Sequence, residues 1–288
     1  MKKAIIFLIF VGPFYMLSQQ ATKNPNKPEG NVSYLEADMA YISDAVFMGR
    51  KDTIEAPYLI ASLTYTHKSG LYTSGSLSYL TSPDEGRVDL FTLSGGYDLK
   101  KEKFITGISI TGYFFNDDSY NVQSSVSSDV SVYAGFDLSL LNAYIMGSMY
   151  FSDNDTDIFL GTELNKTIYI DRKNSFYLLP GFGINAGSLN FYNTYYQTQR
   201  LGRRKGKNSS GITDPPQNIV IEEADKFVLL DYELSLIAGY EFDNFELAFI
   251  PVFAFPQNET TITVDDEILN EELENTFYWS VSLTYKFN

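Results

Sequence analysis

The chain has 288 residues, including 22 Phe, 22 Tyr and a single His, and its formal net charge at pH 7 is −15. It contains no Cys, which excludes a disulfide framework and a lipid-anchored lipoprotein terminus. So acidic a chain lacks the basic surface that nucleic-acid binding requires, and we expect no nucleic-acid partner. Abundant aromatic residues among Gly and Ser favour strands over helices.

The N-terminus has the layout of a secretory signal peptide. Lys2 and Lys3 form a basic start, and an apolar run of eight residues follows them. That run is shorter than the ~20 residues of a membrane-spanning helix, which argues against the alternative of an N-terminal anchor. We expect a signal peptide at 1–18, a periplasmic linker at 19–32 and one β-barrel domain at 33–288.

Beyond the linker, apolar residues alternate with small or polar ones in long segments. In the final segment Phe277, Trp279 and Val281 share one face, and Ser280 and Ser282 share the other. Segments of about ten residues with this pattern are typical of strands in transmembrane barrels. Twelve such segments begin near Ser33, Ala56, Leu71, Arg87, Lys103, Val126, Leu141, Asp157, Ser175, Lys226, Phe245 and Phe277.

The connections between these segments alternate in length. Every second one is tight, at 68–70, 99–102, 139–140, 171–174 and 243–244, and the others are longer, at 50–55, 81–86, 116–125, 152–156, 188–225 and 257–276. Outer-membrane barrels have short periplasmic turns and longer external loops. The sequence therefore predicts an all-β fold, a transmembrane antiparallel up-and-down β-barrel of about 12 strands with periplasmic termini, in the bacterial outer membrane.

A soluble β-sandwich or a lipocalin-like barrel is the alternative fold, because it would also alternate. Its strands are usually about 5–6 residues long, which is shorter than the segments predicted here. Aromatic pairs at segment ends, such as Tyr150-Phe151 and Phe176-Tyr177, also fit the aromatic girdles of a membrane barrel. Both features favour the transmembrane barrel.

Two short motifs resemble known classes of exported protein. Phe287, with Tyr285, Leu283 and Val281 before it, resembles the terminal strand that the barrel-insertion machinery recognises, although Asn288 follows the aromatic residue. The leader ending in Ser-Gln-Gln resembles those of Bacteroidetes-type Gram-negative bacteria. The resemblance implies insertion into an outer membrane by that machinery.

The first quarter of the chain is similar to a family of small porins (TorF-like). The likeness rests on Ser43-Asp44, Phe47, Gly49-Arg50, Thr53 and Pro57, followed by Ser69-Gly70-Leu71-Tyr72. In that family Arg precedes Gly after an aromatic residue, whereas Met48-Gly49-Arg50 reverses the order here. The resemblance implies passage of small solutes.

The residues offer little support for an enzyme. A serine hydrolase of the outer membrane needs a His near the external edge, and His67 is predicted beside the periplasmic turn at 68–70. We expect no enzyme activity and no cofactor. Asp153, Asp155 and Asp157 alternate as at the start of a calcium loop, which makes them weak candidates for metal ligands. Ile158 and Leu164 occupy the positions where such a loop has Gly and Glu, so we favour a solvated external turn and expect no metal.

The long fifth connection, 188–225, carries a basic run of Arg200, Arg203, Arg204, Lys205 and Lys207. Loops longer than about 15 residues are usually functional or disordered. The run is predicted either to fold inward and narrow the barrel, or to contact lipopolysaccharide phosphates. Disorder is the third alternative.

If the apolar faces meet lipid, nine carboxylates face the lumen: Glu36, Asp38, Asp129, Asp137, Glu163, Asp231, Glu233, Glu241 and Glu246. Carboxylate rings in a pore attract cations. The same faces also carry Tyr side chains, such as Tyr113 and Tyr177. A water-filled lumen and a lumen filled by side chains therefore both remain alternatives.

The sequence predicts a porin-like channel for passive diffusion of small neutral or cationic solutes through an acidic lumen, narrowed by the fifth loop. The alternative is a closed barrel that serves as a structural or adhesive surface protein through its external loops. The expected partners are outer-membrane lipid, lipopolysaccharide, the barrel-insertion machinery and small solutes.

Overall fold

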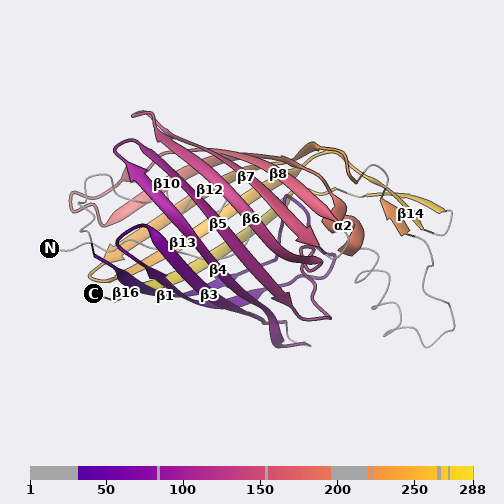
Figure 1. The fold of residues 1–288 in the computed structure, drawn as a ribbon, viewed down its shortest axis with the longest axis horizontal. Helices are drawn as coiled ribbons and strands as arrows, with labels where there is room; N and C mark the ends of the chain where they lie inside the picture. Colours follow the sequence, from indigo (N-terminus) through magenta and orange to yellow (C-terminus); the bar gives the residue numbers. More distant parts are fainter. Residues whose placement is uncertain are drawn as a thin grey trace.

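The computed structural model describes residues 32–82, 85–152, 155–195, 219–221, 224–264, 267–271 and 273–287, and the predicted signal peptide at 1–18 lies outside them. Twelve long strands form one antiparallel sheet that closes on itself (Figure 1). In barrel order they are β1 (Tyr34–Ile42), β2 (Tyr58–Thr66), β3 (Leu71–Leu80), β4 (Arg87–Lys101), β5 (Phe104–Phe115), β6 (Val126–Asp137), β7 (Asn142–Ser152), β8 (Thr156–Asn165), β10 (Phe176–Gly187), β12 (Val228–Phe242), β13 (Phe245–Pro256) and β16 (Thr276–Phe287). The first strand pairs with the last, so no barrel strand is left with an open edge.

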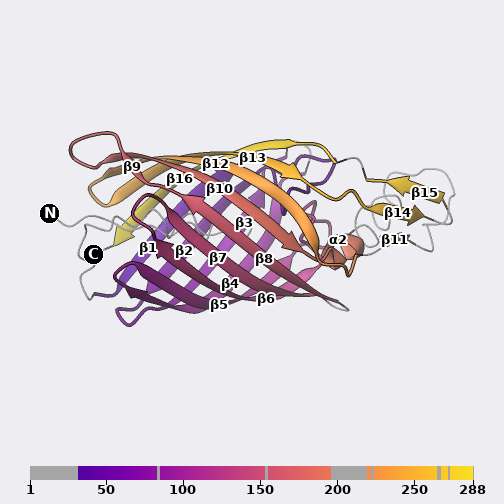
Figure 2. The same ribbon diagram turned by 90° about the horizontal axis from the view of Figure 1, so that it is seen from above.

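Five short elements lie in the connections. β9 (Ile168–Tyr169) pairs with β10, and α2 (Asn190–Tyr195) follows β10. β11 (Ile219–Ile221), β14 (Thr261–Val264) and β15 (Glu267–Asn270) form a separate three-stranded sheet. Figure 2 shows this sheet beyond α2, at the end of the barrel opposite the termini. No helix in the described part of the chain is long and apolar enough to cross a membrane.

Side chains alternate between the two faces of each strand, so the closed sheet has a polar interior and an apolar outer face. Leu93 and Ile110 point outward and are 55% and 59% exposed, whereas Thr92 and Thr111 beside them point inward and are buried. Apolar side chains of this kind cover the outer face on every side of the barrel. A closed barrel satisfies every backbone hydrogen bond within the sheet, which a strand needs in order to cross a membrane.

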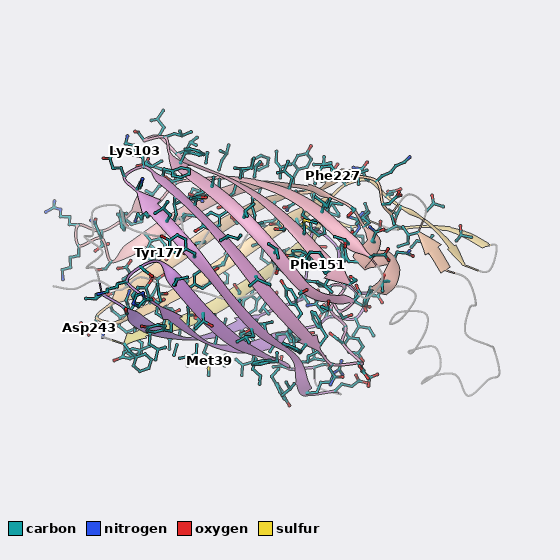
Figure 3. All side chains as sticks on the ribbon, in the orientation of Figure 1. Met39, Lys103, Phe151, Tyr177, Phe227 and Asp243 are labelled. Carbon is teal, nitrogen blue, oxygen red and sulfur yellow. The ribbon has the colours of Figure 1, made fainter. Side chains whose placement is uncertain are left out.

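The tight turns and the longer connections lie at opposite ends, as predicted. Figure 3 shows Lys103 and Asp243, which occupy tight turns, at the end where the termini lie, and Phe151 and Phe227 toward the other end. In the turn after β9, the backbone N–H groups of Phe176, Ser175 and Lys173 hold the pKa of the Asp171 carboxyl below its ordinary value. We assign the tight turns to the periplasmic side and the longer connections to the external side.

The prediction of twelve antiparallel strands is confirmed, and each strand begins within two residues of the predicted start. Two details were wrong. β1 ends at Ile42 instead of continuing to the connection predicted at 50–55, because the apolar residues 45–48 pack inside the barrel. A bulge between β10 and β12 also shifts the register near Leu230, so this side chain is buried inside instead of facing outward with Tyr232.

Candidate functional site in the barrel lumen

The nine predicted carboxylates all lie on inward-facing positions of the barrel strands. They are Glu36 and Asp38 on β1, Asp129 and Asp137 on β6, Glu163 on β8, Asp231, Glu233 and Glu241 on β12, and Glu246 on β13. Six of them are buried, and Asp137, Glu233 and Glu241 are partly buried. The barrel thus gathers carboxylates from five strands around one interior.

Most of the buried carboxylates are held by neutral groups. Asp38 accepts a hydrogen bond from Thr284 (2.6 Å). Asp129 accepts bonds from Tyr113 (2.7 Å) and Ser131 (2.6 Å). Glu163 accepts one from Asn165 (2.6 Å). These partners orient the carboxyl groups without supplying a positive charge to pair with them.

Lys286 is a cation close to this acidic surface. Its Nζ lies 3.9 Å from Glu36 Oε1 and 3.4 Å from the centre of the Tyr34 ring. Both contacts are near the periplasmic ends of β16 and β1. The positive charge therefore sits at the periplasmic mouth, away from the middle of the lumen.

Opposite β12, the lumen is lined by small hydroxyl side chains, which we call the hydroxyl wall. Its members are Ser62, Thr64, Ser74, Ser76, Ser78, Thr92, Ser94, Ser109 and Thr111, on strands β2 to β5. Cross-strand bonds join Thr64 to Ser74 (2.7 Å) and Ser76 to Thr92 (2.6 Å). In the order of the sheet, β4 lies six strands from β12, so this wall faces Asp231 and Glu233.

The external half of the lumen is occupied by the connection between β1 and β2, residues 43–57, which we call the first loop. Phe47 and Arg50 exchange backbone hydrogen bonds (2.8 and 3.0 Å) and form a tight hairpin, the loop tip. Met48 and Gly49 between them have φ values of +51° and +75°. A two-residue hairpin turn requires this left-handed geometry, for which Gly is favoured.

The loop tip spans the interior of the barrel. The Phe47 ring lies 5.7 Å from Tyr150 on β7, 5.7 Å from Phe159 on β8 and 5.0 Å from Phe191 on α2. β7 is six strands from β1 in either direction around the barrel. Phe47 belongs to the loop that follows β1 and contacts Tyr150 on β7, so the loop tip reaches across the lumen.

Charged side chains anchor the first loop at its tip and its base. Arg50 and Glu271, both buried, form a two-point contact, with Nε 3.1 Å from Oε1 and Nη2 3.3 Å from Oε2. At the base, Asp44 accepts the N–H groups of Ala45 (3.0 Å) and Ala56 (2.9 Å). Tyr195 on α2 donates a hydrogen bond to Asp52. The loop is therefore fixed to the fifth and sixth external connections.

Asp157, one of the three weak candidates for a metal ligand, has a structural role in this fold. Its carboxylate accepts the N–H groups of Asn190 (2.8 Å) and Phe191 (2.7 Å) and the Ser188 hydroxyl (2.6 Å). It caps the first turn of α2 from a neighbouring strand. Asp153 lies outside the described residues, and among those described no group of three or more His, Cys, Asp or Glu residues is placed to hold a metal ion.

Two other predictions concern residues at the ends of the barrel. His67 lies in the periplasmic turn, where its Nδ1 is 2.8 Å from the Ser69 hydroxyl, as the predicted topology required. The basic run Arg200, Arg203, Arg204, Lys205 and Lys207 lies outside the described residues. Within the described parts of the fifth connection, α2 packs Phe191 against the loop tip.

Sequence reasoning missed the first loop as the element that fills the lumen. A signal was present, because Ala45-Val46-Phe47-Met48 is an apolar run inside an external connection. The alternation of β1 hides it, since the run also fits a continuation of that strand. The partnership of Arg50 with Glu271, 221 positions away, had no local signal.

The closed antiparallel sheet and its apolar outer face define a bacterial outer-membrane β-barrel protein. No family model matches the chain, and no curated protein matches its sequence.

Solved structures with a similar fold include three outer-membrane channels. The KdgM porin is 9% identical and matches 88% of this chain and 99% of its own, with a TM-score of 0.48. The NanC porin is 10% identical and matches 88% and 100%, with a TM-score of 0.46. An outer-membrane channel from Pseudomonas putida F1 is 13% identical and matches 89% and 96%, with a TM-score of 0.47.

Proposed function

We propose that this protein is a porin-like channel for small neutral or cationic solutes, with an acidic lumen that the first loop closes reversibly. One observation carries the proposal: Asp38, Asp129, Glu163 and Asp231 are buried and hydrogen-bonded by neutral side chains. A buried carboxylate without a paired cation costs several kcal/mol in a dry interior. Such residues are expected where water or a passing cation supplies the missing partner.

The two walls of the lumen support passage of polar solutes. The carboxylates would attract cations and repel anions. The hydroxyl wall would exchange hydrogen bonds with a neutral polar solute, since each hydroxyl both donates and accepts. Passive diffusion along these walls requires no reaction, and His67 in its periplasmic turn is not placed for hydrolysis at the external edge.

The closed barrel remains a second candidate, and the first loop is the observation that favours it. The loop tip and α2 bury Phe47, Phe191 and Tyr195 in the external half of the barrel. A permanently closed barrel would act only through its external surface, as a structural or adhesive protein. The two candidates differ in whether the first loop leaves the lumen.

The proposal extends to export and biogenesis. A signal peptide at 1–18 would direct export, and the terminal strand ending in Phe287 would be recognised by the barrel-insertion machinery. The external loops would contact lipopolysaccharide. The motif around Phe47 and Arg50 supports kinship with TorF-like porins of Bacteroidetes-type bacteria.

Conductance of the refolded barrel in a planar bilayer tests the channel. We expect discrete steps and a cation-selective reversal potential under a salt gradient. Asp231→Asn combined with Glu233→Gln should lower the cation preference, because it removes two charges from the acidic wall.

Glu102→Gln with Asp171→Asn is the matched control, since it removes two charges from the periplasmic turns and should leave the reversal potential unchanged. A folded barrel that gives no steps, even when Phe47→Ala has loosened the first loop, would support the closed barrel.

A further inference from the structure

Two oxygen atoms below the loop tip are buried without a donor. Asp231 on β12 and Asn185 on β10 are paired across the sheet, and Asn185 Nδ2 donates to Asp231 Oδ1 (2.6 Å). The other carboxylate oxygen of Asp231, Oδ2, and the amide oxygen of Asn185, Oδ1, have no hydrogen-bond partner, although the two residues are 0% and 1% exposed. Buried acceptors nearly always have a hydrogen-bond partner in proteins, so we expect a hydrogen-bond donor to bind at this position.

The same position holds more acidic than basic side chains. Glu233 lies two residues from Asp231 on the same face of β12, and the Tyr278 hydroxyl donates a hydrogen bond to it (3.1 Å). Arg50 is the cation that approaches them from the first loop, and its charge acts on Asp231. Its Nε and one Nη are already bonded to Glu271, and the remaining Nη1 is buried without a partner. Arg50 therefore offsets the charge of Asp231 without satisfying its free oxygen.

The loop backbone rests directly on this site. A Cβ added to Gly49 would lie 3.0 Å from the Asp231 Cβ and 3.0 Å from the Pro256 Cβ. The guanidinium of Arg50, the next residue, is bonded to Glu271 in the sixth connection, and its charge acts on Asp231 from there. When the first loop moves, this cation moves with it and the site is uncovered.

Resting on the proposed channel function, we propose that Asp231, Asn185 and Glu233 bind the ammonium or guanidinium group of a cationic organic solute, and that Arg50 competes with the solute for this site. The free oxygens accept several N–H donors from such a group, which also balances the excess charge. A metal ion is less suited, because no three carboxylates in the described chain are placed to coordinate one.

Titration of the folded, detergent-solubilised barrel with methylguanidinium chloride, followed by ligand-observed NMR, tests the site without requiring conduction. We expect Asp231→Asn to weaken binding about tenfold, since it removes a charge-assisted hydrogen bond. Arg50→Gln should tighten binding about tenfold, because it removes the internal competitor. Glu233→Gln provides a second test of the same site if Asp231→Asn does not fold, as judged by heat-modifiable migration in gels.

Glu271→Gln is the matched control for Arg50→Gln. Both substitutions break the same ion pair, but only Arg50→Gln removes the competing guanidinium, so Glu271→Gln should not tighten binding. Equal tightening in both variants would overturn the competition, because it would show that loosening the loop is sufficient. Tetramethylammonium has the same charge without N–H donors and should bind at least about tenfold more weakly; equal binding would overturn the hydrogen-bonding site.

The outcomes separate this site from the channel. Methylguanidinium binding that depends on Asp231, in a barrel that gives no conductance steps, would support the site and contradict the channel. Conductance steps without such binding would support the channel and contradict the site.

Discussion

Gly49 is the residue on which the seating of the loop tip depends most directly. Its φ of +75° is in the left-handed region, and the space beside it is closed by Asp231 and Pro256. An alanine there must adopt a conformation that costs an L-residue about 1–2 kcal/mol and must also displace its neighbours. Because glycine has no side chain, the loop backbone can approach the barrel wall at this position.

We predict that Gly49→Ala loosens the loop tip by about 1–3 kcal/mol without unfolding the barrel. The Arg50 amide, which is bonded to the Phe47 carbonyl, should exchange with solvent at least about tenfold faster. Hydrogen exchange followed by mass spectrometry measures this change. Gly75→Ala is the control, since its Cβ would meet only the Thr92 carbonyl at 3.8 Å. Unchanged exchange at Arg50 in Gly49→Ala would contradict the prediction.

Among the structural elements, the first loop has an apolar anchor in the ring of Phe47. The ring packs on Tyr150, Phe159 and Phe191, which come from two strands and α2. Removing a buried Phe side chain typically costs about 3–5 kcal/mol, part of which is the cavity left behind.

We predict that Phe47→Ala releases the first loop from the lumen for part of the time. Trypsin added outside the membrane should then cleave after Arg50 or Lys51, whereas Arg50 is only 2% exposed in the docked loop. Mass spectrometry of the fragments identifies the site.

Phe253→Ala is the control, because that ring contacts Phe277 on the outer face at 4.6 Å and does not touch the loop. If trypsin cleaves Phe47→Ala after Arg50 no faster than it cleaves the unsubstituted barrel, other contacts are sufficient to hold the first loop in the lumen.

The elements also show how far the sequence alone determines this fold. Period-two alternation and turn spacing located all twelve strands, because a membrane barrel imposes both patterns on every strand. The position of the first loop inside the barrel was not predicted, since an apolar run has the same pattern whether it continues a strand or packs inside the barrel. The β12 bulge at Leu230 was not predicted either, because one extra residue breaks the register without changing composition. The inward positions of the nine carboxylates followed from alternation, whereas their hydrogen-bond partners required the three-dimensional structure.

At the scale of the whole molecule, the apolar outer face determines stability in the membrane. We predict that Leu93→Lys, near the middle of β4, lowers the free energy of unfolding from a bilayer by about 2–4 kcal/mol. Leu71→Lys, at the periplasmic end of β3, should cost no more than about 1 kcal/mol, because its side chain can reach the interface. Denaturant titration of both variants in lipid vesicles measures the difference. Equal losses would mean that these two positions lie at the same depth.

The contact between Arg50 and Glu271 joins two residues that are 221 positions apart, and β1 closes the sheet by pairing with β16. The first loop is synthesised early, yet its anchor belongs to the last external connection. During assembly the barrel therefore passes through a stage in which its seam and its lumen are both unsealed. Closure of the seam and docking of the loop depend on the same final segment of the chain. Loss of that segment would therefore leave the seam open and the first loop without the partner of Arg50.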